Sequence, residues 1–309
     1  MIRIGFFGQA AEAQEWHQKL TPFLDDFEIV DLVSDAGRNC DVALVWAPPE
    51  GALAHLPNLK GIILQGQGVD HMMADASVPR DVPLVRLVDP DMSDALSHWA
   101  ILNALDFWRD GASYRDQQAS KTWASIPQRS HEEAIVGVLG VGAIGSVIAR
   151  RFAALGFKTR GWALTQKTIE NVDVFAGPDA LADFAEGVNI SVCVLPLTPE
   201  TRGIMNADYF NRLAYGAFVI NGGRGPQVND DDLLAALDRG QIGGAALDVF
   251  AIEPLPAEHP YWAHPKVRVW PHVAAQTNPD SASKQVAAAI QAMTNGDEPA
   301  NRVEWSRGY

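Results

Sequence analysis

The stretch AIVGVLGVGAIGSVIARRF, residues 134–152, decides the fold of this chain. It starts as an apolar run typical of a buried strand and ends in an apolar pattern of helical period. Between them lies the pattern GxGxxG. Such a loop is typical of a dinucleotide-binding βαβ unit, because its glycines permit a tight turn, close approach of a pyrophosphate and close packing of helix on strand. We therefore predict a cofactor-binding loop made of Gly140, Gly142, Ala143, Ile144 and Gly145.

Short apolar strands alternate with helical patterns along the whole chain, which predicts parallel sheets built from βαβ units. The expected strands are residues 2–7, 28–32, 42–46, 61–64, 84–87, 134–139, 158–162, 190–195, 218–221, 245–249 and 267–270. We predict an α/β fold of two doubly wound parallel-sheet domains, a Rossmann NAD(P)-binding domain and a flavodoxin-like substrate domain.

The domain order follows from two helical patterns. A helix whose start is capped by Ser93 or Asp91 is expected to connect the two domains, and a helix at 281–293 is expected to return to the first. We therefore predict a discontinuous substrate domain at 1–98 and 279–309, with the dinucleotide-binding domain at 99–278.

Composition excludes several classes of function. The 309 residues carry 24 Lys and Arg against 38 Asp and Glu, a net charge of −14, which argues against nucleic acid or an anionic membrane as a partner. The two cysteines, Cys40 and Cys193, and the histidines show no metal-ligand spacing, so we expect no metal. No secretory leader pattern and no apolar run of about 18 residues is present, and we expect a cytoplasmic protein.

The coenzyme preference depends on the residues that follow the second strand of the dinucleotide-binding domain. An acidic residue there usually binds the adenosine 2′-OH of NAD, but this strand ends in Ala163, Leu164 and Thr165. No carboxylate is available to repel a 2′-phosphate, and Lys167 or Arg160 could lie near one. The sequence therefore favours NADPH slightly and leaves NADH open.

Three polar residues in the C-terminal half point to chemistry at the carboxyl edge of the sheet. Arg224, Glu253 and His272 each follow a predicted strand, and ligands of open α/β sheets bind at that edge. Reduction of a 2-oxo acid needs a cation for the carboxylate and carbonyl, and an acid for the developing alkoxide. Arg224 offers a planar donor fork, His272 is a proton donor near neutral pH, and Glu253 is the carboxylate expected beside it.

Several longer spans carry a family resemblance that covers essentially the whole chain. They are LPLTPETRGIMN (195–206), NGGRG (221–225), DDDLLAALDRGQIGGAALDVFAIEPLP (230–256) and PHVAA (271–275). Together they resemble the D-2-hydroxyacid dehydrogenases. ALVWAPP (43–49), GQGVD (66–70) and the terminal RGY (307–309) are similar to the glyoxylate/hydroxypyruvate reductase A branch of that family in particular.

The resemblance implies roles for individual residues. It implies that Arg224 binds substrate and takes part in catalysis, that His272 donates the proton, and that Glu253 is its hydrogen-bond partner. It also implies a nicotinamide contact for Asp248, a place beside the substrate for Trp46, and a homodimer. The backbone donors for the substrate carboxylate would be Gly66, Gln67, Gly68 and Val69. The remaining cofactor contacts would be Leu164, Thr165, Leu195, Pro196 and Thr201.

One departure from the family pattern concerns the loop that bears Arg224. Gly222 and Gly223 stand where small side chains are more usual, which predicts a looser loop. Two alternatives to a reductase of glyoxylate or hydroxypyruvate stay open at this point. One is a cofactor-sensing, corepressor-like binding protein on the same fold, and the other is a dehydrogenase of another 2-hydroxy acid.

Overall fold

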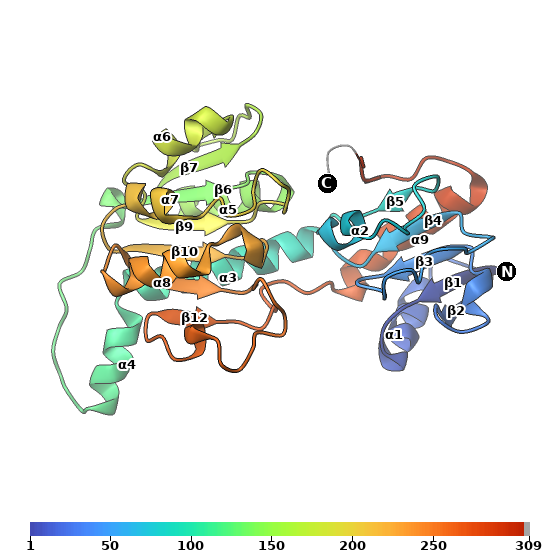
Figure 1. The fold of residues 1–309 in the computed structure, drawn as a ribbon, viewed down its shortest axis with the longest axis horizontal. Helices are drawn as coiled ribbons and strands as arrows, with labels where there is room; N and C mark the ends of the chain where they lie inside the picture. Colours follow the sequence, from blue (N-terminus) through green and yellow to red (C-terminus); the bar gives the residue numbers. More distant parts are fainter. Residues whose placement is uncertain (306–309) are drawn as a thin grey trace. The chain divides into compact units, whose positions relative to one another are not determined.

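The chain forms two compact units in a computed structural model that describes residues 1–305 (Figure 1). One unit comprises Met1–Met92 and the segment from Gln276 onward, and the other comprises Ser93–Ala275. Each unit contains one sheet, and all the paired strands within both sheets of the described chain run parallel. These features confirm the predicted α/β fold of two doubly wound parallel-sheet domains.

The first unit has a five-stranded sheet in the order β2-β1-β3-β4-β5, the order of flavodoxin-like folds. Its strands are β1 (Ile2–Phe6), β2 (Phe27–Asp31), β3 (Val42–Val45), β4 (Gly61–Leu64) and β5 (Leu84–Val85). Its helices are α1 (Ala10–Leu20), α2 (Asp70–Ala74) and α9 (Pro279–Asn295). Helix α9 packs on α1, β3 and β4, so the C-terminal helix completes the core of the N-terminal sheet.

The second unit has a seven-stranded sheet in the order β12-β11-β10-β9-β6-β7-β8. Its strands are β6 (Ile135–Leu139), β7 (Lys158–Ala163), β8 (Asp173–Ala176), β9 (Ile190–Cys193), β10 (Ala217–Asn221), β11 (Ile242–Leu247) and β12 (Val267–Val269). The sequence predicted six of them and missed β8. That strand pairs with β7 and has four residues, none fully buried, of which only Val174–Ala176 form an apolar run.

Six α-helices belong to the described part of the second unit. They are α3 (Pro90–Trp108), α4 (Gly111–Ala119), α5 (Ala143–Ala154), α6 (Leu181–Ala185), α7 (Ala207–Arg212) and α8 (Asp230–Asp238). The predicted start of α3 is wrong, because the helix begins at Pro90, ahead of both Asp91 and Ser93. The carboxylate of Asp89 accepts a hydrogen bond of 3.1 Å from the Asp91 N–H, as an N-cap residue does.

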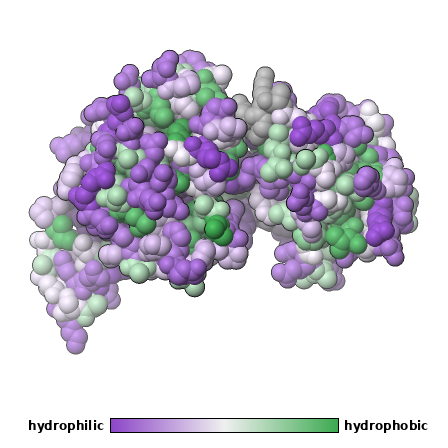
Figure 2. All heavy atoms as spheres, viewed as in Figure 1, coloured by the Kyte–Doolittle hydropathy of each residue, from purple (hydrophilic) through white to green (hydrophobic). Residues whose placement is uncertain are grey.

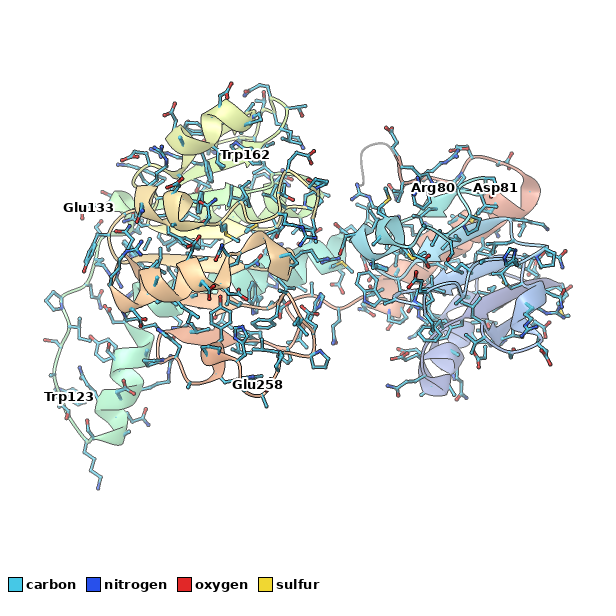
Figure 3. The ribbon with its side chains drawn as sticks, in the orientation of Figure 1. Arg80, Asp81, Trp123, Glu133, Trp162 and Glu258 are labelled. Carbon is cyan, nitrogen blue, oxygen red and sulfur yellow. The ribbon has the colours of Figure 1, made fainter. Side chains whose placement is uncertain are left out.

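Helix α4 and the segment 120–130, together called the α4 arm, extend away from the seven-stranded sheet (Figure 1). No residue of α4, all of which is described, is buried. Trp123 lies on this arm and is fully exposed (Figure 3). Hydrophobic side chains lie among hydrophilic ones on the arm in Figure 2. In residues 1–305 no helix is long and apolar enough to cross a membrane.

Candidate active site

The predicted site residues of the second unit all follow the carboxyl ends of its parallel strands. Gly140 follows β6, Leu164 follows β7, Leu195 follows β9, Arg224 follows β10, Asp248 follows β11 and His272 follows β12. The strand order reverses between β6 and β9, where the chain crosses from one half of the sheet to the other. Ligands of open α/β sheets bind beside such a switch point, so the topology gathers these residues at one ligand-binding edge.

The glycine loop has the geometry of a pyrophosphate cradle. Gly140 has φ +95°, which favours glycine, and a Cβ there would approach the Leu195 backbone to 3.0 Å. A Cβ on Gly145 would lie 1.9 Å from the Gly140 carbonyl oxygen, so α5 packs more closely against the loop than any side chain at this position would allow. Next to Gly142 nothing lies within 4 Å of the Cβ position, which leaves the backbone open at the start of α5. The residues present therefore fit a dinucleotide.

The structure distinguishes the two cations considered for a 2′-phosphate. The Arg160 guanidinium donates to the Asp183, Phe184 and Glu186 carbonyls at the end of α6, so it is engaged in the fold. Lys167 Nζ donates 3.1 Å to the Val141 carbonyl inside the glycine loop. The lysine, and not the arginine, therefore lies beside the cofactor cradle.

His272 and Glu253 form a hydrogen-bonded pair. Glu253 Oε2 lies 2.7 Å from His272 Nδ1, and Glu253 Oε1 accepts 2.8 Å from the Phe250 N–H. The backbone thus holds one carboxylate oxygen of Glu253, and the other oxygen binds Nδ1 of His272. Nε2 is the ring nitrogen on the side away from Glu253. The two side chains are 38% and 35% exposed, so a small ligand can reach the imidazole.

The electrostatic surroundings favour the charged forms of both partners. The hydrogen bond to Glu253 raises the pKa of His272; burial and the nearby Arg224 charge oppose this rise without cancelling it. Burial alone would raise the pKa of Glu253, but the hydrogen bonds from His272 and the Phe250 N–H outweigh it and the net shift is downward. The imidazolium therefore persists to higher pH than that of an ordinary histidine.

Asp248 holds the turn that carries His272, a structural function that its residue type also suggested. Its carboxylate is buried and accepts hydrogen bonds of 2.8 and 3.0 Å from the N–H groups of Val273 and Ala274. The His272 N–H donates 2.9 Å to the Asp248 carbonyl. Burial raises the pKa of Asp248, although these backbone hydrogen bonds oppose the rise. Asp248 therefore fixes the turn that carries His272, whose φ is +55°. A nicotinamide contact for Asp248 stays a prediction.

Hydrogen bonds and close packing hold the loop that carries Arg224, and the looseness expected from its two glycines stays a prediction. Buried Asn221 accepts 3.1 Å from the Gly223 N–H and donates 3.0 Å to the Arg224 carbonyl. The Cβ position of Gly222 faces Trp99 at 3.2 Å, and that of Gly223 lies 2.4 Å from Gln227 Oε1. Side chains from elsewhere fill the space that the two glycines leave. The sequence alone did not indicate a role for Asn221, the first residue of NGGRG, or for Gln227, two residues after it, although both are buried amides.

The substrate-side residues of the first unit also follow strand ends. Trp46 follows β3, and the segment Gly66–Val69 follows β4. The Trp46 ring lies 2.4 Å from the Cβ position of Gly66, and its carbonyl lies 2.5 Å from His71 Nε2. The structure therefore places Trp46 against Gly66 and His71, at the two ends of a stretch that contains Gln67, Gly68 and Val69. Their contacts with substrate stay a prediction.

Metal-ligand chemistry has no candidate in the described chain. Over residues 1–305 no group of three or more His, Cys, Asp or Glu side chains could hold a metal ion. Cys40 and Cys193 are buried thiols, and burial raises their pKa values to about 11 and about 12. The terminal RGY (307–309) lies outside the described residues, which end at Trp305.

Known proteins with similar sequences place the chain in a family. Residues 101–274 match the model of the D-isomer specific 2-hydroxyacid dehydrogenase NAD-binding domain. Glyoxylate/hydroxypyruvate reductase A of Yersinia enterocolitica is 39% identical to this chain over the full length of both proteins.

Two solved structures are similar to this chain over its whole length. One is a D-isomer specific 2-hydroxyacid dehydrogenase of Xanthobacter autotrophicus in complex with NADPH and MES. It covers 100% of this chain and 99% of its own, at 38% identity and a TM-score of 0.93. The other is an NADPH-dependent glyoxylate/hydroxypyruvate reductase of Sinorhizobium meliloti in complex with NADP and sulfate. It has the same coverage, 33% identity and a TM-score of 0.91. With the glycine cradle and the His272–Glu253 pair at one sheet edge, these matches establish that the chain belongs to the D-isomer specific 2-hydroxyacid dehydrogenase family.

Proposed function

We propose that the protein reduces a small 2-oxo acid, of the glyoxylate or hydroxypyruvate type, to the 2-hydroxy acid with NADPH or NADH. The observation that carries this proposal is the 2.7 Å His272–Glu253 pair at the same sheet edge as the glycine cradle. A histidine kept protonated by a carboxylate suits a reaction that ends by protonating an alkoxide. Relatives named as glyoxylate/hydroxypyruvate reductases support the substrate class.

Each residue has a chemical part in this proposal. When bound, the reduced dinucleotide supplies the hydride. The glycine loop, together with Leu195, Pro196 and Thr201, would hold the dinucleotide. The Arg224 guanidinium binds the substrate carboxylate and polarises the ketone oxygen, where negative charge develops. His272 donates the Nε2 proton to that oxygen, while Glu253 holds Nδ1 and stabilises the imidazolium. The protein itself therefore supplies orientation, charge stabilisation and one proton.

A matrix of coenzymes and acids tests the proposal. NADPH and NADH are each mixed with glyoxylate, hydroxypyruvate, pyruvate and longer 2-oxo acids, and loss of absorbance at 340 nm is followed. We expect turnover with the small acids and faster turnover with NADPH. Cofactor binding without oxidation by any acid would favour the corepressor-like sensor instead. A maximum at a long side chain would favour a dehydrogenase of another 2-hydroxy acid.

Replacing Glu253 by glutamine should change the pH dependence of reduction. Reduction needs the imidazolium, so activity is full below the pKa of His272 and falls as the pH rises through it. The hydrogen bond from Glu253 is the main cause that raises this pKa. We therefore expect the alkaline limb of kcat to move to lower pH in Glu253→Gln. The matched control is Glu258→Gln, which changes an exposed acid of the same loop (Figure 3). An unmoved limb would remove Glu253 from this role.

The preference for NADPH depends on Lys167 in our proposal. No acidic residue follows β7, Leu164 is 46% exposed there, and Lys167 lies beside the glycine loop. A hydrogen bond between charged groups is worth roughly 10- to 100-fold in affinity, so Lys167→Ala should lower kcat/KM for NADPH by about that factor. NADH should respond by less than about 2-fold, because it has no 2′-phosphate. Lys158→Ala, at the other end of β7, is the control. Equal losses with both coenzymes would contradict this assignment.

We also propose that the protein is a cytoplasmic homodimer. The α4 arm supports the dimer, because it presents a helix without buried residues and a fully exposed Trp123. A second copy of the chain would cover the exposed Trp123 ring. Light scattering should give twice the chain mass of 33.5 kDa, and the monomer mass would contradict the dimer. The two buried free thiols are compatible with a reducing compartment.

A further inference from the structure

The side chain of Gln227 joins two loops of the candidate site. Gln227 ends the 3₁₀ turn Gly225–Gln227 and is fully buried. Its Oε1 accepts 2.8 Å from the Arg224 N–H, and the Cys193 thiol lies 3.4 Å from the same oxygen. Its Nε2 donates 2.8 Å to the Leu195 carbonyl and 3.2 Å to the Pro196 carbonyl. Both donors and both acceptor positions of the amide are therefore in use.

These contacts link the two functional parts of the site. Arg224 lies in the loop after β10, whereas Leu195 and Pro196 lie in the loop after β9, where cofactor contacts are predicted. Gln227 also occupies the space at Gly223, because a Cβ there would lie 2.4 Å from its Oε1. Gly223 and the Gln227 side chain thus pack against each other next to Arg224.

We propose that Gln227 is a positioning residue for Arg224. The Gln227 side chain accepts the hydrogen bond of the Arg224 backbone N–H, and its amide nitrogen binds the loop after β9. This inference rests on the proposed reductase function. The Arg224 backbone is extended, with φ −139° and ψ 146°, and buried Gln227 and Asn221 hold it from its N–H and its carbonyl respectively. Without Gln227, the start of the arginine side chain loses one of these two anchors. Misplacement by about 1 Å can cost roughly 100-fold in rate.

Two substitutions separate positioning from mere stability. Gln227→Met keeps the volume and removes every side-chain hydrogen bond of this residue, so kcat/KM for glyoxylate should fall by roughly 10- to 100-fold. Gln227→Glu keeps an acceptor for the Arg224 N–H but directs a carboxylate at two carbonyl oxygens. Burial favours the neutral acid, which can donate as the amide does. The activity of this variant relative to wild type, at the same pH, should therefore rise as the pH falls.

Gln241 provides the matched control within the same unit. Its Nε2 also donates to two carbonyls, those of Phe210 and Leu213, at 2.9 and 3.0 Å, but it does not contact the Arg224 loop. Gln241→Met and Gln241→Glu should cost thermal stability without the change in kcat/KM or the pH-dependent recovery. Binding of oxalate to the NADPH complex, followed by calorimetry, gives a readout besides turnover. It should weaken about as much as kcat/KM in Gln227→Met.

A double-mutant cycle decides whether Gln227 acts through Arg224. In an Arg224→Met background, Gln227→Met should cost less than about 3-fold in oxalate affinity and in turnover. Equal costs in both backgrounds, or losses matched by Gln241→Met, would overturn the inference. If the wild-type protein reduces none of the acids, the proposed function fails. The oxalate cycle still tests the positioning, so the two failures can be told apart.

Discussion

Replacing His272 by alanine should lower the turnover number for glyoxylate by roughly 100- to 10,000-fold, the usual contribution of a positioned general acid. The imidazole is the group at this sheet edge whose pKa is raised by a carboxylate, and it is 38% exposed. The backbone around it should stay in place, because the Val273 and Ala274 N–H groups bind the Asp248 carboxylate and not the ring. Stopped-flow measurement of NADPH oxidation gives the rate of the chemical step.

The affinity for NADPH should remain within about 2-fold in His272→Ala, because the glycine cradle lies on other strands. His264→Ala is the matched control, since His264 is also paired with a carboxylate, Asp238, at 3.5 Å. This control should turn over at the wild-type rate. Full activity in His272→Ala would refute the assignment of the proton donor and, with it, the mechanism proposed above.

Replacing Arg224 by methionine should lower kcat/KM for 2-oxo acids by at least about 1,000-fold. The substitution removes the fork that binds the carboxylate and the charge that stabilises the developing alkoxide, and one such donor alone is worth roughly 100- to 1,000-fold. Arg224→Lys should recover only part of this loss, because a point charge cannot bind both oxygens of a carboxylate.

Two comparisons interpret the Arg224 measurement. Arg239→Met is the control, since the Arg239 guanidinium lies 2.7 Å from Asn211 Oδ1 on the surface, and we expect it to leave kcat/KM unchanged. Removing Arg224 also removes a positive charge that opposes protonation of His272, so the alkaline limb of Arg224→Met should lie at higher pH than in wild type. A loss confined to KM would indicate binding without stabilisation of the transition state.

The sequence predicted the features that depend on local pattern. Fully buried strands such as β3 and β4 read as continuous apolar runs, and the sequence predicted a strand at each of the five strands of the first sheet. The edge strand β8 was missed because its apolar run, Val174–Ala176, is only three residues long. The start of α3 was misplaced because Asp91 and Ser93 both resemble caps, whereas Asp89 ahead of Pro90 has that position.

The supporting residues of the site could not be predicted, because their partners are distant in sequence. Gln227 donates to Leu195, 32 residues away, and Asp248 accepts from Ala274, 26 residues away. Nothing in NGGRG itself indicates that a glutamine fills the space beside Gly223. Residue type and strand position were sufficient to nominate His272 and Glu253, because both follow strands of one sheet. Predicting what holds them requires the packing around them.

The strand order separates the predicted catalytic residues from most of the predicted cofactor contacts along the sheet edge. The strands β10 and β12 carry Arg224 and His272, on either side of β11 with Asp248, whereas β6, β7 and β9 carry the other cofactor contacts that we predict. Evolution or engineering could therefore exchange the coenzyme by altering the end of β7 while proton transfer continues unchanged, and the two sets of substitutions should combine additively. Gln227 crosses the border between β9 and β10. Substitutions at Gln227 should therefore not combine additively with either set.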